Sequence, residues 1–198
     1  ISNEGNERII DLPKIEESGY VLNINTDSIK LLAKIFISDD LLNQSDLSLI
    51  VHQYGRTIFT AKIATSKNYA AVSLPLNDFP SGVSTITLFN NSSIPVAERL
   101  IFINHQTDHI NIEPYKLNKV YSKNEEINLV FNTNIQQDPV MGSFSVSVTD
   151  ENLVVPNIHN ETNIYTDFLM KSDLKGHIET PNYYFIDDII LKKKKEKY

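Results

Sequence analysis

Asp173, His177 and Glu179, within the stretch SDLKGHIE, combine residue types that bind metal ions or act in acid–base catalysis. Asp173 and His177 are four residues apart, a spacing that places two ligands on one face of a helix. Gly176 interrupts such a helix, and the neighbouring sequence contains no recognisable third ligand. We therefore favour a structural turn here over a metal site or a catalytic site.

Pairs of adjacent acidic residues offer the oxygen ligands that calcium prefers. None of these pairs belongs to the repeated Asp/Asn ladder of a dedicated calcium loop, and acidic residues are common in ordinary turns. We favour solvated turns at all three pairs, which are Asp39 and Asp40, Asp150 and Glu151, and Asp187 and Asp188. No metal ion or other cofactor is expected.

Hydrolase chemistry is a further hypothesis, because a serine–histidine dyad is recognised by geometry and not by sequence position. The chain has no Gly-x-Ser-x-Gly elbow, and none of its 6 glycines belongs to a phosphate-binding loop. We therefore favour structural roles for the remaining histidines, which are His52, His105, His109 and His159.

Exposed aromatic side chains could form a glycan platform, because their rings stack on sugars at a small entropic cost. Core packing and interdomain contacts are the competing roles, and we expect them to take most of the tyrosines. The tyrosines available for such a platform are Tyr54, Tyr69, Tyr115, Tyr121, Tyr183 and Tyr184.

Glu98 and Arg99 stand between apolar residues in the stretch 81–104. They form either a buried or interdomain ion pair, or two exposed side chains at a strand edge. The surrounding pattern predicts a strand covered on both faces, where a lone buried charge would be costly. We therefore favour pairing, in a structural role.

The composition is that of a folded protein with an acidic surface. Hydrophobic residues make up 41% and charged residues 22% of the chain, and the net charge is −7. An acidic chain without a basic stripe argues against nucleic-acid binding. The absence of cysteine excludes disulfides and thiolate chemistry, and no apolar run approaches the ~20 residues that span a bilayer. Because the chain begins at Ile1, without Met or a signal sequence, we expect a processed or excised piece.

Seven short runs rich in β-branched and aromatic residues lie between residues 18 and 104, separated by turn signals. Their spacing of about 8–12 residues is typical of an immunoglobulin-like β-sandwich, with a barrel as the alternative. The runs 29–37 and 96–103 are expected to be covered on both faces. Residues 1–17 form a lead-in that either pairs as an edge strand or hangs loose. The expected strands are 19–25, 29–37, 47–53, 57–63, 69–76, 83–89 and 96–103.

Residues 105–107 are expected to link this domain to a second β-sandwich at 108–185. Its clearest strand is 143–150, where Phe144, Val146 and Val148 alternate with serine and threonine. The other expected strands are 110–114, 119–121 and 126–132.

A change of hydrophobic period predicts one short helix at 163–171. Ile164, Phe168 and Lys171 lie at i, i+4 and i+7, and Asn163 is a plausible N-cap. With four or five strands and a helix, the second domain is irregular or incomplete. Residues 186–198 form a charged C-terminal tail.

Four stretches carry a family resemblance by their content, order and spacing. They are SGVSTITLFNNSSIPVAERLIFIN (81–104), INIEPYKLNKVYSKNEEINLVF (110–131), SFSVSVTDENLVV (143–155) and SDLKGHIETPNYYF (172–185). Together they resemble the macroglobulin-like (MG2-type) β-sandwich repeats of large Bacteroidota cell-envelope proteins. In that family, carboxypeptidase-regulatory-like and TonB-receptor-plug-like domains follow such repeats.

The resemblance implies a non-catalytic module of the periplasm or cell surface, associated with the outer membrane and flanked by further domains. Two departures limit it: the thioester of macroglobulin protease traps needs a cysteine, and no plug-like motif follows residue 185. In this context the run Asp27–Ser28–Ile29 resembles the O-glycosylation motif of Bacteroidota envelope proteins, with an ordinary turn as the alternative.

The leading functional hypothesis is therefore a non-enzymatic structural or protein-interaction module of a larger envelope protein. Its expected partners are envelope proteins or other domains of the same full-length chain. A glycan-binding module linked to nutrient uptake is the alternative, and a hydrolase is the third hypothesis.

Overall fold

The computed structural model describes residues 2–3, 6–7, 11–105, 107, 109–115, 118, 120–150, 152–154, 157 and 161–185. The secondary structure of these residues is mostly β-strand, so the all-β prediction is confirmed. Contacts divide the chain into two compact units, Ile1–Asp78 with Thr85–Leu100 and Phe79–Ser84 with Ile101–Tyr198. This division falls within a hairpin, whereas the sequence predicts a boundary at residues 105–107.

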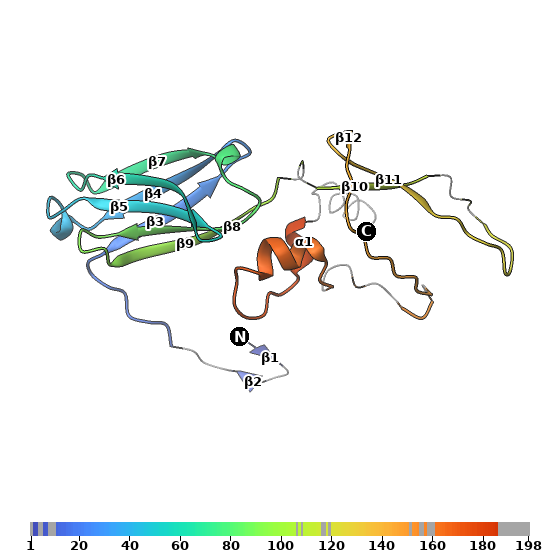
Figure 1. Ribbon diagram of the computed structural model, residues 1–198. Helices are drawn as coiled ribbons and strands as arrows, with labels where there is room; N and C mark the ends of the chain where they lie inside the picture. Colours follow the sequence, from blue (N-terminus) through green and yellow to red (C-terminus); the bar gives the residue numbers. More distant parts are fainter. Residues whose placement is uncertain are drawn as a thin grey trace. The chain divides into compact units, whose positions relative to one another are not determined.

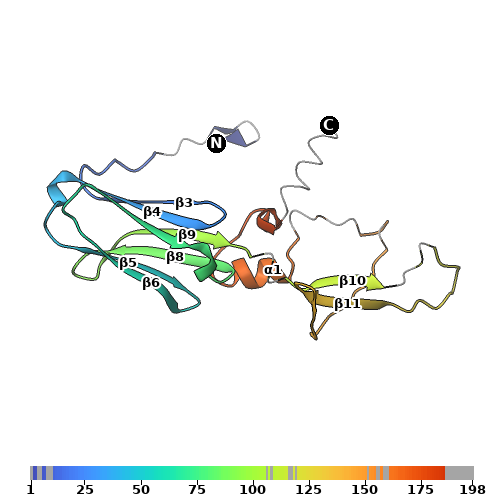
Figure 2. The same cartoon turned by 90° about the horizontal axis from the view of Figure 1, so that it is seen from above.

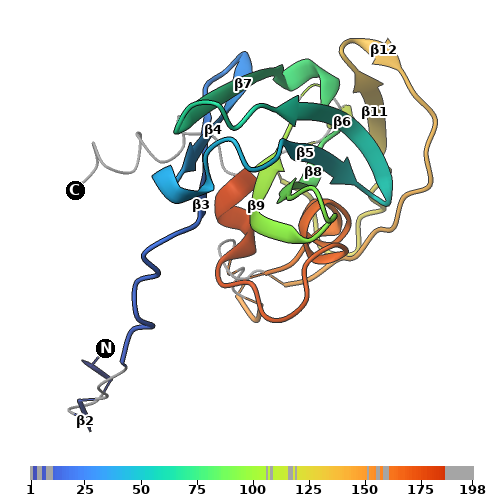
Figure 3. The same cartoon turned by 90° about the vertical axis from the view of Figure 1, so that its left-hand side faces the viewer.

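The seven strands between residues 18 and 104 agree with the predicted ones to within one residue at each end. They form a three-stranded sheet, β3-β4-β7, and a four-stranded sheet, β6-β5-β8-β9. The end-on view in Figure 3 shows β3, β4 and β7 on one side and β5, β8 and β9 on the other. The strands are β3 (Tyr20–Thr26), β4 (Lys30–Ile37), β5 (Leu47–Gln53), β6 (Arg56–Ile63), β7 (Tyr69–Pro75), β8 (Gly82–Phe89) and β9 (Pro95–Ile103).

Alternate residues of both sheets are buried, which is why a period of two in the sequence locates these strands. Leu31 and Ile35 of β4, Leu49 of β5 and Ile86 of β8 are inaccessible to solvent. Burial of each such side chain contributes about 1.5–3 kcal/mol. The immunoglobulin-like or macroglobulin-like class of this unit stays a prediction.

The expectation that β4 and β9 are covered on both faces is wrong. Lys30 and Phe36 of β4 are exposed, and so is Leu100 of β9. Leu100 of β9 is exposed because β9 is an edge strand, the last in the order of its sheet. The strand buried on both faces is β8, where Ser84 and Thr87 are as inaccessible as their apolar neighbours.

The second unit contains a smaller sheet of β10 (Asn111–Tyr115), β11 (Val130–Ile135) and β12 (Asp138–Pro139), in that order. β10 and β11 run antiparallel and lie side by side in Figures 1 and 2. β10 confirms the strand predicted at 110–114, whereas the strand predicted at 126–132 begins later. The strand predicted at 119–121 is not formed at Val120 and Tyr121, and Lys119 lies outside the described residues.

The strand predicted at 143–150 is not formed, because its backbone pairs with no other strand in the described part of the chain. Its apolar residues are correspondingly exposed: 50% for Phe144, 71% for Val146 and 88% for Val148. Alternation therefore identified a segment with the composition of a half-buried strand, but not its hydrogen-bonding partner.

The helix predicted at 163–171 is confirmed, as the short α1 (Ile164–Thr166) continued by a π-helical turn (Asp167–Lys171). The residues that define the predicted helical period do not form its buried face. Thr166 and Met170 are buried, whereas Ile164 and Phe168 are largely exposed. Shorter 3₁₀ segments occur at Asp39–Leu41, Leu76–Asp78 and Pro181–Phe185.

The predicted lead-in forms a two-stranded pairing of its own, between β1 (Ser2–Asn3) and β2 (Asn6–Glu7). Residues 11–16 that follow it are exposed and belong to no strand. The predicted tail 186–198 lies outside the described residues. Within the described part, no helix combines the length and the apolar character needed to cross a membrane.

Candidate functional site

Asp173, His177 and Glu179 are exposed and lie in the irregular stretch that follows the π-helical turn. Gly176 adopts a φ of 99°, which agrees with the structural turn favoured from the sequence. Across the described residues, no group of three or more His, Asp or Glu side chains is placed to hold a metal ion.

Asp39 and Asp40 of the first acidic pair and Asp150 of the second lie within the described residues. Asp40 accepts a hydrogen bond from the Ser18 hydroxyl at 2.6 Å, within the 3₁₀ segment that also contains Asp39. Asp150 accepts a hydrogen bond from the backbone N–H of Asn152 at 2.8 Å. The Asp150 contact is that of a turn, whereas the Asp40 contact joins two stretches 22 residues apart; both acidic residues are exposed. Glu151 and the pair at 187–188 lie outside the described residues.

Ser28 is exposed in the turn between β3 and β4. The preceding Asp27 shapes this turn, because its carboxylate accepts hydrogen bonds from the backbone N–H groups of Ile29 and Lys30, both at 2.8 Å. These two bonds lower the pKa of Asp27 below its ordinary value of 3.8. O-glycosylation of Ser28 remains a prediction.

Two of the described histidines, His105 and His109, contact other residues of the fold. The His105 ring is 2.8 Å from the carbonyl oxygen of Phe79, and the His105 backbone N–H donates to the Ser81 hydroxyl. His109 stacks on Tyr165 at a centroid distance of 4.2 Å. The hydrolase hypothesis stays a prediction. His52 and His177 are exposed, and His159 lies outside the described residues.

Glu98 and Arg99 do not form the favoured ion pair, because both are exposed on β9 and their charges do not meet. Successive strand residues point to opposite faces, which separates the two side chains. Glu98 instead accepts a hydrogen bond from the Thr87 hydroxyl at 2.9 Å, and Arg99 donates to the Glu98 backbone oxygen at 2.8 Å. Their observed contacts are those of exposed side chains on an edge strand.

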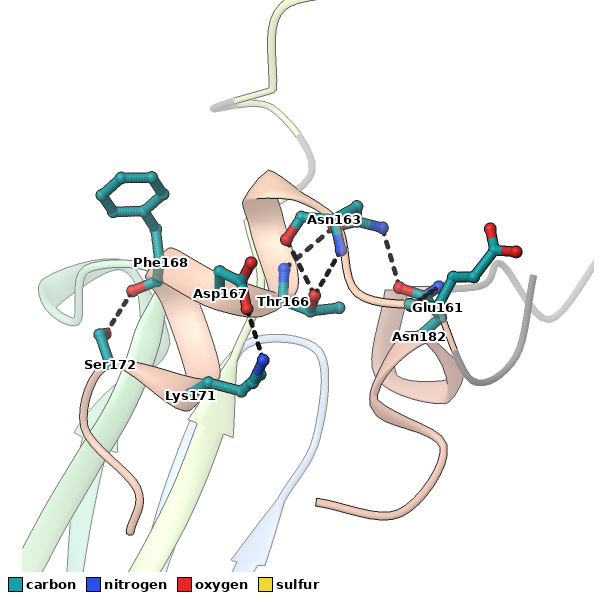
Figure 4. Close-up of polar contacts among 8 residues, drawn as sticks. All are labelled: Glu161, Asn163, Thr166, Asp167, Phe168, Lys171, Ser172 and Asn182. Atoms are coloured by element: carbon teal, nitrogen blue, oxygen red, sulfur yellow. Dashed lines mark hydrogen bonds and ion pairs between the residues drawn. The ribbon is translucent and has the colours of Figure 1, made fainter. Parts of the chain in front are cut away.

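A polar network in the second unit joins α1 to the 3₁₀ segment Pro181–Phe185 (Figure 4). The Asn163 side chain accepts a hydrogen bond from the backbone N–H of Thr166 at 3.0 Å and donates to the Asn182 oxygen at 2.8 Å. The Asn182 amide in turn donates to the Glu161 backbone oxygen at 2.6 Å. Thr166 and Asn182 are buried, so these bonds satisfy polar groups that water does not reach. This network is structural.

The candidate tyrosines do not gather on one surface of a unit. Tyr121 accepts a hydrogen bond from the backbone N–H of Asn118, and Tyr184 packs edge-on against Phe102 and Tyr183. Tyr54 and Tyr115 are about half exposed, in the turn after β5 and in β10. Tyr69 alone joins an exposed apolar row.

That row, which we call the aromatic row, consists of Val21, Phe36 and Tyr69 on the outer face of the β3-β4-β7 sheet. The three residues are register partners across the sheet, and the Phe36 and Tyr69 rings lie 5.3 Å apart between centroids. All three are about half exposed. The next row on this face contains Asn23 and Lys34, about 7 Å away along the strands.

A second exposed apolar surface, the apolar groove, lies within the second unit. It is formed by Ile112 of β10 and by Phe131 and Thr133 of β11, together with residues 144–147. Its volume is about 550 Å³, within the range of about 300–1,000 Å³ that is usual for binding sites. Ile112 and Thr133 are register partners, so their side chains share one face of the sheet.

The sequence interpretation missed both surfaces. For the aromatic row a signal was present, because Lys30 and Lys34 occupy the alternate positions that Phe36 shares and thereby mark that face as solvent-facing. For the apolar groove the signals were the alternation of Phe144 and Val146 with serine and the number of strands, too few for a covered sheet.

Comparison of the chain with protein-family models, with curated proteins and with solved structures finds no match. The function must therefore be argued from the two exposed surfaces and from the sequence itself.

Proposed function

We propose that this chain is a non-enzymatic protein-interaction module of a larger cell-envelope protein, located in the periplasm or at the cell surface and associated with the outer membrane. The observation that carries the proposal is the apolar groove. Ile112, Phe131, Phe144 and Val146 are each about half exposed or more, and they gather around one hollow. Exposed apolar surface of this kind marks interaction sites.

The envelope setting of the proposal rests on the resemblance to macroglobulin-like repeats. In support of its non-enzymatic character, His105 contacts a backbone carbonyl oxygen, His109 stacks on a tyrosine ring, and Asp150 accepts a hydrogen bond within a turn. A spacer without a partner is the competing structural role, and it would leave the apolar groove without a function.

The test is affinity capture from an envelope fraction with a groove variant, Phe131→Ser combined with Val146→Ser. We expect a protein that the native chain retains to be lost with this variant. Because Ile29 is an exposed apolar residue in the β3–β4 turn, Ile29→Ser is the matched control and should retain the same protein. Equal retention by all three chains, each shown to be folded by circular dichroism, would refute an interaction through the apolar groove.

The aromatic row supports a second candidate function, a glycan-binding module. Its two rings present apolar faces, and Asn23 and Lys34 provide hydrogen-bonding groups one row away, the combination that sugars require. Tyr69→Ala should abolish oligosaccharide binding, whereas Tyr69→Phe, which keeps the ring, and Tyr54→Ala, in the turn after β5, should preserve it. Oligosaccharide binding that survives Tyr69→Ala would refute this candidate.

A further inference from the structure

Residues 143–149 have the sequence of a β-strand without the pairing of one. Phe144, Val146 and Val148 alternate with serine and threonine, the pattern of a strand that covers apolar surface on one face. Within the described part of the chain, their backbone N–H and C=O groups join no sheet. A segment of this kind offers a row of hydrogen-bonding groups to another extended chain.

The apolar groove lies beside this same segment. Phe144 and Val146 form part of its lining, and Ile112 and Phe131 of the β10–β11 sheet form another part. An extended chain that pairs with 143–149 would therefore direct every second side chain toward apolar surface. In strand addition of this type, main-chain bonds supply affinity and the apolar pockets select alternate side chains.

The charge of the surrounding sequence indicates the chemistry of the occupant. Residues 108–185 contain eleven acidic and five basic residues. Asp138 in β12 and Asp150 at the end of the segment are exposed acids of this unit. A second copy of the chain would place two acidic surfaces together, which is unfavourable, whereas basic side chains on the occupant would be attracted.

We propose that residues 143–149 pair with an extended strand of a partner polypeptide whose apolar residues enter the apolar groove and alternate with lysine or arginine. This inference rests on the proposed interaction function and specifies its partner. It names a mode of binding, strand addition, that the capture experiment alone does not test.

The probe is a synthetic ten-residue peptide of alternating lysine and valine, added to the full 198-residue chain. Amide hydrogen exchange of 143–149 is the measurement. In the free chain these amides should exchange rapidly, and peptide at ten times its dissociation constant should slow them about tenfold. A peptide with proline at its two central positions should give no protection, because proline lacks the N–H and disrupts pairing.

Two further comparisons separate strand pairing from general attraction. A peptide of alternating glutamate and valine should protect the segment less than the lysine peptide, and the difference should shrink in high salt. The variant Val146→Ser should weaken protection by the lysine peptide, whereas Ile29→Ser should leave it unchanged. Val146 is largely exposed, so its replacement leaves the fold intact.

Three outcomes would overturn the proposal: amides of 143–149 already protected in the free chain, equal effects of the lysine and proline peptides, or concentration-dependent protection of 143–149 in the free chain that shows self-pairing. A protein captured through the apolar groove without protection of 143–149 would overturn strand addition and leave the proposed interaction function standing. Protection by the lysine peptide without any captured protein would leave strand addition standing and overturn the proposed interaction function.

Discussion

Removal of the Asn163 side chain should destabilise the second unit, because this exposed side chain makes hydrogen bonds to two buried residues, Thr166 and Asn182. It accepts the hydrogen bond that caps α1, and it donates to the buried Asn182. Loss of an N-cap costs about 1 kcal/mol, and loss of one hydrogen bond to a side chain that keeps other contacts costs about 0.5–1.5 kcal/mol. Asn163→Ala should therefore lower the free energy of unfolding by about 1.5–2.5 kcal/mol, the sum of these two effects.

Urea denaturation followed by circular dichroism measures this loss, and amide exchange shows where it occurs. Faster exchange should appear in 164–171 and in 181–185, the two segments that the network joins. Asn163→Asp separates the two contributions, because a carboxylate still caps the helix but cannot donate to Asn182. We expect it to be intermediate in stability between the native chain and Asn163→Ala.

The matched control is Asn25→Ala, which removes an exposed asparagine from β3 and should change stability by less than about 0.5 kcal/mol. The double variant Asn163→Ala with Asn182→Ala should lose less than the sum of the single losses, since both single changes break the same bond. Equal stability of Asn163→Ala and Asn25→Ala would refute the reasoning, as would strictly additive losses in the double variant.

Three further predictions concern turns. Gly55 has a φ of 71° in the turn after β5, so Gly55→Ala should cost about 1 kcal/mol in urea unfolding even though no atom crowds the new side chain; no loss would contradict the assigned φ. Gln136 and Gln137 both have positive φ in the β11–β12 turn, so replacing them by Asn and Gly should stabilise the hairpin by about 1 kcal/mol or more, measured in the same way. The lowered pKa of Asp27 means that its carboxylate stabilises the fold above pH 3.8 and that this contribution is lost as the pH falls through the lowered value. The native chain should therefore be more stable than Asp27→Ala at pH 7, and the difference should disappear in acid; a difference that persists at low pH would exclude the charge as its cause.

The strands of the first unit could be predicted because each local signal agreed with the fold. Alternating apolar residues and polar turns locate β3 to β9 to within one residue. What the pattern could not predict was the position of each strand in its sheet. β9 reads as a buried strand, yet it is an edge strand, because sheet order depends on contacts between residues distant in the sequence.

For the helix of the second unit, too, the local sequence predicts the element but not the face that is buried. Asn163 was identified as the N-cap because the chemistry of a cap is local. The helical period was found from Ile164 and Phe168, whereas Thr166 and Met170 are the buried residues. Hydrophobicity does not identify this face, since the buried Thr166 makes hydrogen bonds to Asn163 through its hydroxyl within the capping turn.

The segment 143–149 gives a mismatch between sequence and structure of another kind. Its alternation is the most regular in the chain, yet the described structure contains no strand to pair with it. In a paired strand, serine and threonine at the intervening positions would form a polar face exposed to solvent. Phe144, Val146 and Val148 would form the other face, which is apolar and is stabilised by burial. The addition of one strand would pair the backbone of this segment, and apolar side chains of that strand would lie beside Phe144 and Val146 in the apolar groove. For this reason we attribute the alternation to binding as well as to folding, and exchange of these few amides, with and without a strand-forming peptide, decides whether that attribution is correct.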